Sequence, residues 1–138
     1  MNNYKFSQLF VGLSHSFTVT ITEEMIDKFI DLTGDVSPIH TSNLYAKNHG
    51  FKDRVCHGML FGSMFSTMAG VYLPGEHCLL HSIETKFSSP VYPGDNLTVF
   101  AKISEINETF KIATIKGNIK NQDGKTVCKA IIQAGVRE

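Results

Sequence analysis

The stretch HGMLFGSMFSTMAGVY, His57 to Tyr72, decides the fold because it is a long run that is apolar on nearly every side. Its composition predicts a helix, which at 1.5 Å per residue spans roughly 24 Å. That length is too short for a bilayer, and a helix that is apolar all round belongs in a protein core. We therefore expect this segment to be the central helix of the core.

One side of this predicted helix carries only small residues. Gly58, Gly62, Ser66 and Gly70 follow one another at a constant spacing of four, which places them in a line. A glycine inside a helix costs roughly 1 kcal/mol relative to alanine, so the groove predicts a close neighbour. That neighbour can be the sheet, a partner subunit or a ligand such as an acyl chain.

The half of the chain after the central helix predicts strands. Its runs of β-branched and aromatic residues are separated by turn sequences, and NQDGK at 121–125 is typical of a hairpin. These runs are Cys78–Phe87, Asn96–Ile106, Phe110–Asn121 and Thr126–Val136. Short links favour antiparallel pairing. We predict an α+β fold in which a curled antiparallel sheet wraps around one long helix.

The half before the central helix predicts a strand, a helix and a turn. HSFTVTI at 15–21 alternates as a strand does. Thr22 is a suitable N-cap for the helix that follows, and Gly34 is a suitable C-cap at its end. Asp35 is therefore expected in irregular backbone just beyond that helix. A further short helix is predicted from about residue 42 to residue 48.

The turn DVSPIHTSNLYA, residues 35–46, places a carboxylate and an imidazole on either side of a proline. Asp35 and His40 would point apart on a regular helix, but a turn stiffened by Pro38 can aim both into one cleft. A carboxylate and an imidazole that face one water molecule can act as general base and general acid. The ordinary alternative is that each side chain caps nearby backbone groups.

The run FIDLTGDVSPIHTSNLYAKNHGFKDRVCHGMLFGSMFS, residues 29–66, resembles the MaoC-like, (R)-specific enoyl-CoA hydratase family of hot-dog folds. The matching features are the D-x-x-P-x-H turn, the Tyr-Ala and Gly-Phe pairs that follow it, and HGM at the start of the helix. FSSPVYPGDNLTV at 87–99 resembles the residues that lead into a later strand in the family. The resemblance spans about residues 10–135, and it implies one MaoC-like hot-dog domain over residues 1–138. Ser37 stands where the family usually has asparagine, which bears on loop geometry or substrate range more than on the reaction class.

The resemblance implies (R)-specific hydration of trans-2-enoyl-CoA to (R)-3-hydroxyacyl-CoA, or the reverse dehydration, without a cofactor or a metal. Asp35 and His40 would be the catalytic dyad that shares the water, with Asp35 as the expected base. The Gly58 amide would be the oxyanion donor at the helix N-terminus, and Ser66 would support the site. The ordinary alternatives are tight packing for Gly58, a bond back to the helix for Ser66, and packing for His57.

Composition and charge limit the classes of partner that can be expected for this chain. The 138 residues include 13 basic and 13 acidic ones with no basic stripe, so nucleic acid is not expected as a partner. Neither a signal peptide nor a membrane span is visible, and the three cysteines lack a metal or redox spacing. We expect a reduced, cytoplasmic protein that acts on an acyl-CoA or acyl-carrier-protein thioester. The resemblance implies a homodimer or a dimer of dimers, because a lone curled sheet leaves an edge exposed.

Three other functions stay open at this point. A hot-dog thioesterase would place an acid on or beside the central helix, yet residues 58–72 contain no Asp or Glu. A non-catalytic acyl-CoA binding module would not need the Asp35 and His40 pair. A specialised dehydratase for an unusual acyl or biosynthetic substrate would carry the same motif. The motif also does not distinguish substrates by the length of their acyl chain.

Overall fold

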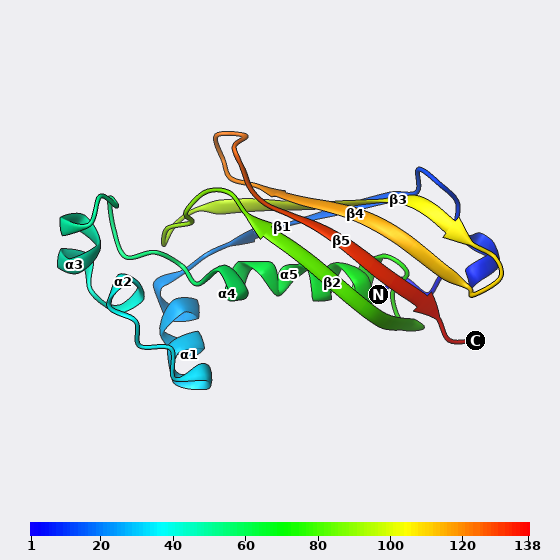
Figure 1. The fold of residues 1–138 in the computed structure, drawn as a ribbon, viewed down its shortest axis with the longest axis horizontal. Helices are drawn as coiled ribbons and strands as arrows, with labels where there is room; N and C mark the ends of the chain where they lie inside the picture. The colour runs from blue at the N-terminus through cyan, green and yellow to red at the C-terminus, as the bar shows by residue number, and fades with distance from the viewer.

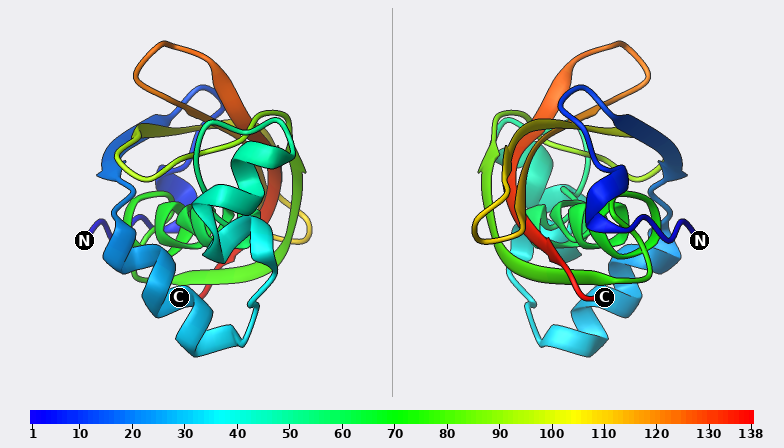
Figure 2. Two further views of the ribbon diagram at one scale, coloured as in Figure 1. Left: turned by 90° about the vertical axis from the view of Figure 1, so that its left-hand side faces the viewer. Right: turned by 90° about the vertical axis from the view of Figure 1, so that its right-hand side faces the viewer.

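A five-stranded antiparallel sheet curls around a central helical segment, as the end views of Figure 2 show. The computed structural model describes residues 1–138. The strands are β1 Ser14–Thr20, β2 Cys78–Phe87, β3 Asn96–Asn107, β4 Ile112–Lys120 and β5 Thr126–Val136. Their order across the sheet is β1-β3-β4-β5-β2, so the first two strands of the chain form its edges (Figure 1). The predicted α+β arrangement, and the predicted bounds of β2 and β5, are confirmed.

The inner face of the sheet forms one core with the central helical segment. Val99, Ile119 and Cys128 lie side by side on β3, β4 and β5, and all three are fully buried. The ring of Phe65 packs against Gly117, where a Cβ atom would lie only 2.6 Å from that ring. Glycine at this position therefore lets the helix approach the sheet closely. Burying a side chain such as Phe65 stabilises the fold by roughly 1.5–3 kcal/mol.

The central segment has the predicted extent but not the predicted regularity. It consists of α4 Gly58–Gly62, α5 Met64–Thr67 and the π-helical turn η2 Met68–Tyr72. The break falls at Ser63, whose hydroxyl donates to the Leu60 carbonyl at 2.6 Å, a bond that competes with regular helix geometry. The segment belongs to the core as predicted, since Phe61, Phe65 and Met68 on it are buried. One of its sides is nevertheless open to solvent in this chain, where Met59 is 68% exposed.

Three helices gather beyond the end of the sheet, next to the start of α4 (Figure 1): α1 Glu23–Thr33, α2 Pro38–Thr41 and α3 Asn43–Asn48. The 3₁₀ turn η1 Phe6–Gln8, near the N-terminus, lies at the opposite end of the sheet. The caps of α1 are as predicted: Thr22 Oγ1 accepts from the Met25 amide at 3.1 Å, and Gly34 is left-handed with φ 73°. None of the helices is both long and apolar enough to span a bilayer.

The turn after Asp35 is more ordered than expected. It contains the single helical turn α2, because proline is well tolerated at the first position of a helix. His40 belongs to this turn, whereas Asp35 precedes it in irregular backbone, as predicted. Ser37, the residue before the proline, makes no side-chain capping bond. Its backbone amide instead donates to Asp35 Oδ1 at 3.3 Å, which orients the carboxylate.

Candidate active site

Asp35 and His40, the two residues of the predicted dyad, lie side by side near the start of α4. His40 Nε2 is 4.0 Å from Asp35 Oδ2. The His40 side chain is 16% exposed and that of Asp35 is 49% exposed, so the pair has one sheltered and one accessible member. One water molecule with hydrogen bonds of about 2.8 Å can contact both atoms across this distance.

A backbone bond fixes the orientation of the His40 ring. Its Nδ1 lies 2.7 Å from the carbonyl oxygen of Val55. A carbonyl only accepts, so Nδ1 carries the proton of this bond and Nε2 is free to accept another. The Val55 amide in turn donates to the Ile39 carbonyl at 2.9 Å, which joins the segment before α4 to α2. The free nitrogen of His40 therefore faces Asp35.

His57 is a third member of the cluster. Its ring stacks on that of His40, with centroids 3.8 Å apart and planes inclined by 23°. Its Nε2 lies 3.2 Å from the backbone carbonyl of Asp35, so this nitrogen donates, and it also lies 4.0 Å from Asp35 Oδ2. Sequence reasoning favoured a packing role for His57 over a functional one. The only local signal was the position of His57 directly before Gly58, and this position does not predict that its ring stacks on the ring of His40.

Burial determines the charge of His57. The side chain is 2% exposed, and this burial lowers the pKa of His57 below the ordinary value of histidine. The positive charge would also face the second imidazole of His40, which lowers the pKa further, while the bond to the Asp35 carbonyl opposes the shift. Nδ1 is buried without a hydrogen-bond partner, as expected of a neutral ring whose proton is on Nε2.

Asp35, His40 and His57 also form a group of possible metal ligands, whose ligand atoms lie within 4.8 Å of one another. A metal ion binds in the plane of each imidazole ring that holds it. Two nearly parallel stacked rings cannot both direct a lone pair at one ion, and the Nε2 of His57 already donates to a carbonyl. The geometry therefore fits a water molecule between Asp35 and His40 better than it fits an ion.

Arg54 connects the helices that surround the pair. Its side chain is 10% exposed, and its guanidinium bonds to Asp27 Oδ1 at 2.7 Å and, through Nε, to Glu23 Oε2 at 2.8 Å. It also contacts the His40 carbonyl at 3.4 Å. Burial alone would lower the pKa of Arg54, but the two carboxylates outweigh it and raise the pKa. Arg54 thus holds α1 and α2 together on both sides of Asp35.

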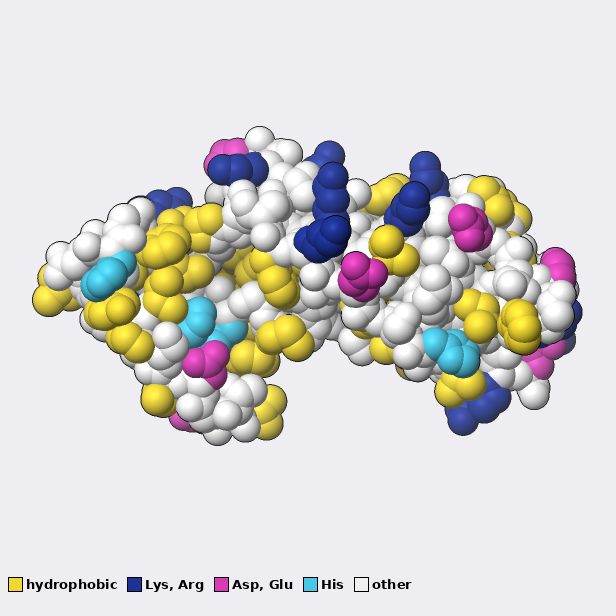
Figure 3. Space-filling model, viewed as in Figure 1, with side chains coloured by type: hydrophobic (Ala, Val, Ile, Leu, Met, Phe, Trp, Pro, Cys, Tyr) yellow, Lys and Arg dark blue, Asp and Glu magenta, His cyan; other side chains and the backbone are white.

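A cavity of about 420 Å³ opens beside His40. Gly58, Phe61 and Phe87 line it, together with the loop that follows β2. Figure 3 shows histidine and acidic side chains among hydrophobic ones on the left of this face. Gly58 begins α4, and the first amides of a helix have no partner within it. The cavity therefore combines an apolar wall, a free backbone donor and the polar cluster.

The small-residue groove of the central helix has two different halves. Phe87 covers the first half, since Cβ atoms at Gly58 and Gly62 would lie 3.0 and 3.3 Å from its ring. Gly70 has no atom within 4 Å of where its Cβ would be, and Ser66 is exposed. Within this chain the sheet is therefore the close neighbour of the first half only, and a close neighbour along the second half stays a prediction for a partner subunit or a ligand. Ser66 does not line the cavity, so this chain alone does not bring it to Asp35 and His40.

Cys56 also lines the cavity but is not a suitable nucleophile. Burial raises the pKa of its thiol to about 12. The reactive form of cysteine is the thiolate, which is scarce at such a pKa. Asp35 and His40 beside the cavity are thus available for acid–base chemistry. The Cys56 thiol is not available as a nucleophile for covalent catalysis.

The sequence profile of the MaoC like domain family matches residues 12–124, most of the chain. This chain belongs to the MaoC-like family. It is 32% identical over 111 residues to an (R)-specific enoyl-CoA hydratase of Rhodospirillum rubrum, covering 80% of this chain and 77% of the relative. It is also 32% identical to the (R)-specific enoyl-CoA hydratase of Aeromonas caviae, with 70% and 72% covered.

A solved structure agrees with this assignment. An R-hydratase of Pseudomonas aeruginosa superposes with a TM-score of 0.92 and 29% identity, covering 99% of this chain and 87% of that one. The predicted hot-dog fold is thereby confirmed. The chain is an enzyme of the hydratase and dehydratase type, a hydro-lyase, which sets aside the thioesterase and the non-catalytic module.

Proposed function

We propose that this enzyme adds water to trans-2-enoyl-CoA to give (R)-3-hydroxyacyl-CoA, or catalyses the reverse dehydration. The observation that carries the proposal is the 4.0 Å separation of Asp35 Oδ2 and His40 Nε2 beside an apolar cavity. Relatives named (R)-specific enoyl-CoA hydratase support the substrate and the stereochemistry. The apolar wall of the cavity suits an acyl chain.

Asp35 and His40 act on one water molecule. The Asp35 carboxylate takes a proton from the water as its oxygen attacks Cβ of the enoyl group. His40 Nε2 accepts a hydrogen bond from the other hydrogen, which stays on the oxygen as part of the new hydroxyl group, and so directs the oxygen lone pair at Cβ. The proton that Cα needs comes from the same pair, so water is added to one face of the double bond. The reverse sequence removes water from the 3-hydroxyacyl thioester.

Gly58 stabilises the negative charge that develops on the thioester oxygen. As Cβ is attacked, the thioester carbonyl becomes an enolate, and a fixed backbone N–H at a helix start is a suitable donor. Loss of one such donor in other enzymes lowers kcat by roughly 10²–10³-fold. The absence of a side chain at Gly58 lets the Phe87 ring, a wall of the cavity, pack directly against the helix start, since a Cβ atom there would lie 3.0 Å from that ring.

His57 serves as a positioning residue. It donates to the backbone of Asp35 and stacks on His40, so it contacts both members of the pair without facing the cavity itself. Because burial keeps the ring neutral, it places no competing positive charge beside the Asp35 carboxylate. The two reacting side chains are thereby held at a fixed separation.

The enzyme is proposed to work as a dimer through the β2 edge. β2 lies at one edge of the sheet, and Leu79 and Leu80 on it are 51% and 41% exposed. An open edge with apolar side chains is prone to pair with another strand. Ser66 on α5 is exposed in this chain, and a partner subunit would cover it. Sedimentation should give a dimer for the wild type and a monomer for Leu80→Lys.

The reaction itself is tested by following the loss of the enoyl-thioester absorbance with crotonyl-CoA. Asp35→Asn and His40→Gln should each lower kcat by at least about 10²-fold while the protein stays folded. Asp31→Asn and His49→Gln are matched controls, because both side chains are exposed, and they should keep wild-type rates. Chiral analysis of the product tests the (R) configuration. A folded wild type that hydrates neither crotonyl-CoA nor longer enoyl-CoA substrates would contradict the proposal.

A further inference from the structure

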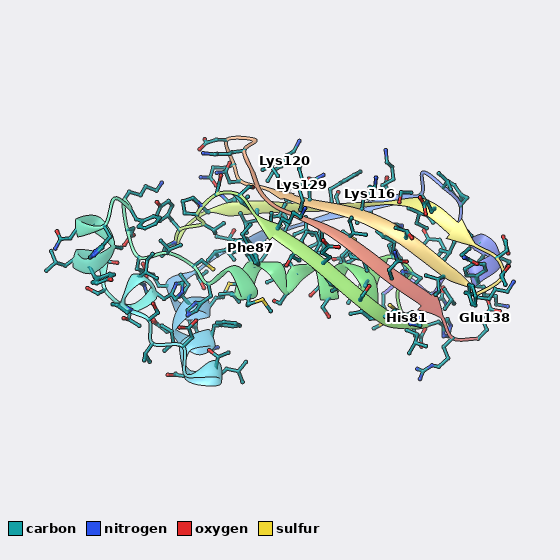
Figure 4. The ribbon with its side chains drawn as sticks, in the orientation of Figure 1. His81, Phe87, Lys116, Lys120, Lys129 and Glu138 are labelled. Carbon is teal, nitrogen blue, oxygen red and sulfur yellow. The ribbon has the colours of Figure 1, made fainter.

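The outer face of the sheet, away from the central helix, carries lysines that the hydration chemistry does not use. Lys86 on β2 pairs directly with Lys129 on β5, and Lys102 on β3 pairs directly with Lys116 on β4. All four are exposed, and we call them the outer lysine patch. Figure 4 labels Lys116 and Lys129 on this side of the sheet, and Figure 3 shows basic side chains gathered over it.

The outer lysine patch keeps its charges unpaired. Like charges placed directly opposite on neighbouring strands destabilise a sheet, and two such pairs occur here. None of the four lysines has a carboxylate within 4.0 Å; the ion pairs of lysine and arginine are made by Lys28, Arg54 and Lys111. Glu84 is the one acid among the residues that line the cavity between Lys86, Lys116 and Lys129, so the net charge there stays positive. A ligand with several negative charges would relieve this repulsion.

The patch encloses a cavity of about 250 Å³. Gly117 and Ala130 form its floor, and Lys86, Lys116 and Lys129 stand around it. Three of the seven lining residues are lysines and one is an acid, Glu84, so the charge around the cavity is net positive. The cavity therefore suits a small polyanion, because lysine binds phosphate as a point charge.

The two cavities are separated by the end of one strand. Phe87 lines the candidate active site, and Lys86 directly before it lines the outer cavity. Successive side chains of a strand point to opposite faces. A substrate that rounds the end of β2 at Ser88 can therefore have its thioester on one face and its phosphates on the other.

We propose that the outer lysine patch binds the phosphate groups of coenzyme A while the acyl thioester reaches Asp35 and His40. This inference rests on the proposed hydratase function and adds the place where the phosphates of its carrier bind. Coenzyme A suits the arrangement because a flexible pantetheine arm separates its thioester from a pyrophosphate and a 3′-phosphate. The patch would then select this carrier over an acyl-carrier protein.

The test compares crotonyl-CoA with crotonyl-pantetheine, which lacks the phosphates. In the double variant Lys86→Ala/Lys129→Ala, KM for crotonyl-CoA should rise about tenfold, equal to roughly 1.4 kcal/mol. Its kcat, and its kinetics with crotonyl-pantetheine, should match the wild type. Lys86→Arg/Lys129→Arg should keep a low KM, and Lys5→Ala/Lys125→Ala removes the same charge from exposed positions elsewhere and should have no effect. Added salt should raise the wild-type KM towards that of the alanine variant.

The outcomes separate the carrier site from the reaction. An active wild type with an unchanged KM in the alanine variant overturns the patch proposal and leaves the hydratase function standing. An alanine variant impaired only with an acyl-carrier-protein substrate also overturns it, in favour of the protein carrier. If the wild type hydrates neither thioester, the hydratase function itself fails. Calorimetry with adenosine 3′,5′-bisphosphate then decides the patch alone: binding lost in the alanine variant supports it, and no binding to the wild type refutes it.

Discussion

The core beneath the sheet and the cluster around Asp35 are built in different ways. In the core, side chains such as Phe65 and Ile119 are fully buried, and their contacts repeat along helix and strands. In the cluster, Asp35, His40 and His57 come from three separate segments, and single contacts hold them in place. The core should thus dominate stability, whereas small displacements in the cluster should dominate activity.

The largest expected effect on stability is in the core. Phe65→Ala removes a fully buried ring that packs on Gly117, and should lower the free energy of unfolding by roughly 3–5 kcal/mol. Urea denaturation measures it as a lower midpoint with an unchanged slope. Phe110→Ala is the matched control, since Phe110 is 73% exposed and should change stability by less than about 0.5 kcal/mol. If Phe65→Ala and Phe110→Ala lowered the free energy of unfolding equally, the buried core would not dominate stability as proposed.

The next effect separates activity from stability at His57. His57→Gln keeps an amide donor for the Asp35 carbonyl, whereas His57→Phe keeps a stacked ring without a donor. If the bond positions Asp35, His57→Phe should lower kcat/KM by about tenfold, equal to roughly 1.4 kcal/mol, and His57→Gln should lose less. Kinetics with crotonyl-CoA and urea denaturation of both variants check this. A kcat/KM that follows stability alone would reduce His57 to a packing residue.

The difference between the two regions also explains what could be predicted from sequence. The bounds of β2 and β5 follow from alternating residues that stop at turn sequences, and the caps of α1 follow from Thr22 and Gly34, so local patterns suffice there. The proximity of Asp35 and His40 was expected from a proline turn. Their roles, and that of Gly58, remain predictions.

The features that sequence reasoning missed depend on distant contacts. Arg54 meets Glu23 across 31 positions of the chain, and His57 meets Asp35 across 22. No periodicity or spacing marks such pairs, because they form only after α1 and α2 have packed. The break at Ser63 was missed because a single hydroxyl bond, invisible in the apolar pattern, decides it.

The Arg54 clamp should have a smaller effect on stability than the core. Arg54→Met leaves Asp27 and Glu23 without a partner, but these side chains are 61% and 59% exposed, so water screens them. We expect a loss of roughly 1–2 kcal/mol, together with a lower kcat because α2 and His40 are less firmly held. Lys28→Met breaks only the exposed pair with Glu24 and should cost about 0–1 kcal/mol without a change in kcat. A wild-type kcat in Arg54→Met would show that the clamp serves stability alone.

The smallest effect is a pH dependence of stability that belongs to the cluster and not to the core. Burial lowers the pKa of His57 in the folded protein, whereas the unfolded chain takes up the proton near pH 6.5. The unfolded state therefore binds more protons below about pH 6.5, and this contribution to stability is present above that pH and lost as the pH falls. Urea denaturation between about pH 8 and pH 5 should show a shallower decline for His57→Phe than for the wild type. Identical slopes for His57→Phe and wild type would mean that His57 is protonated as readily in the folded protein as in the unfolded chain. The inference that a neutral His57 ring lies beside Asp35 would then be wrong.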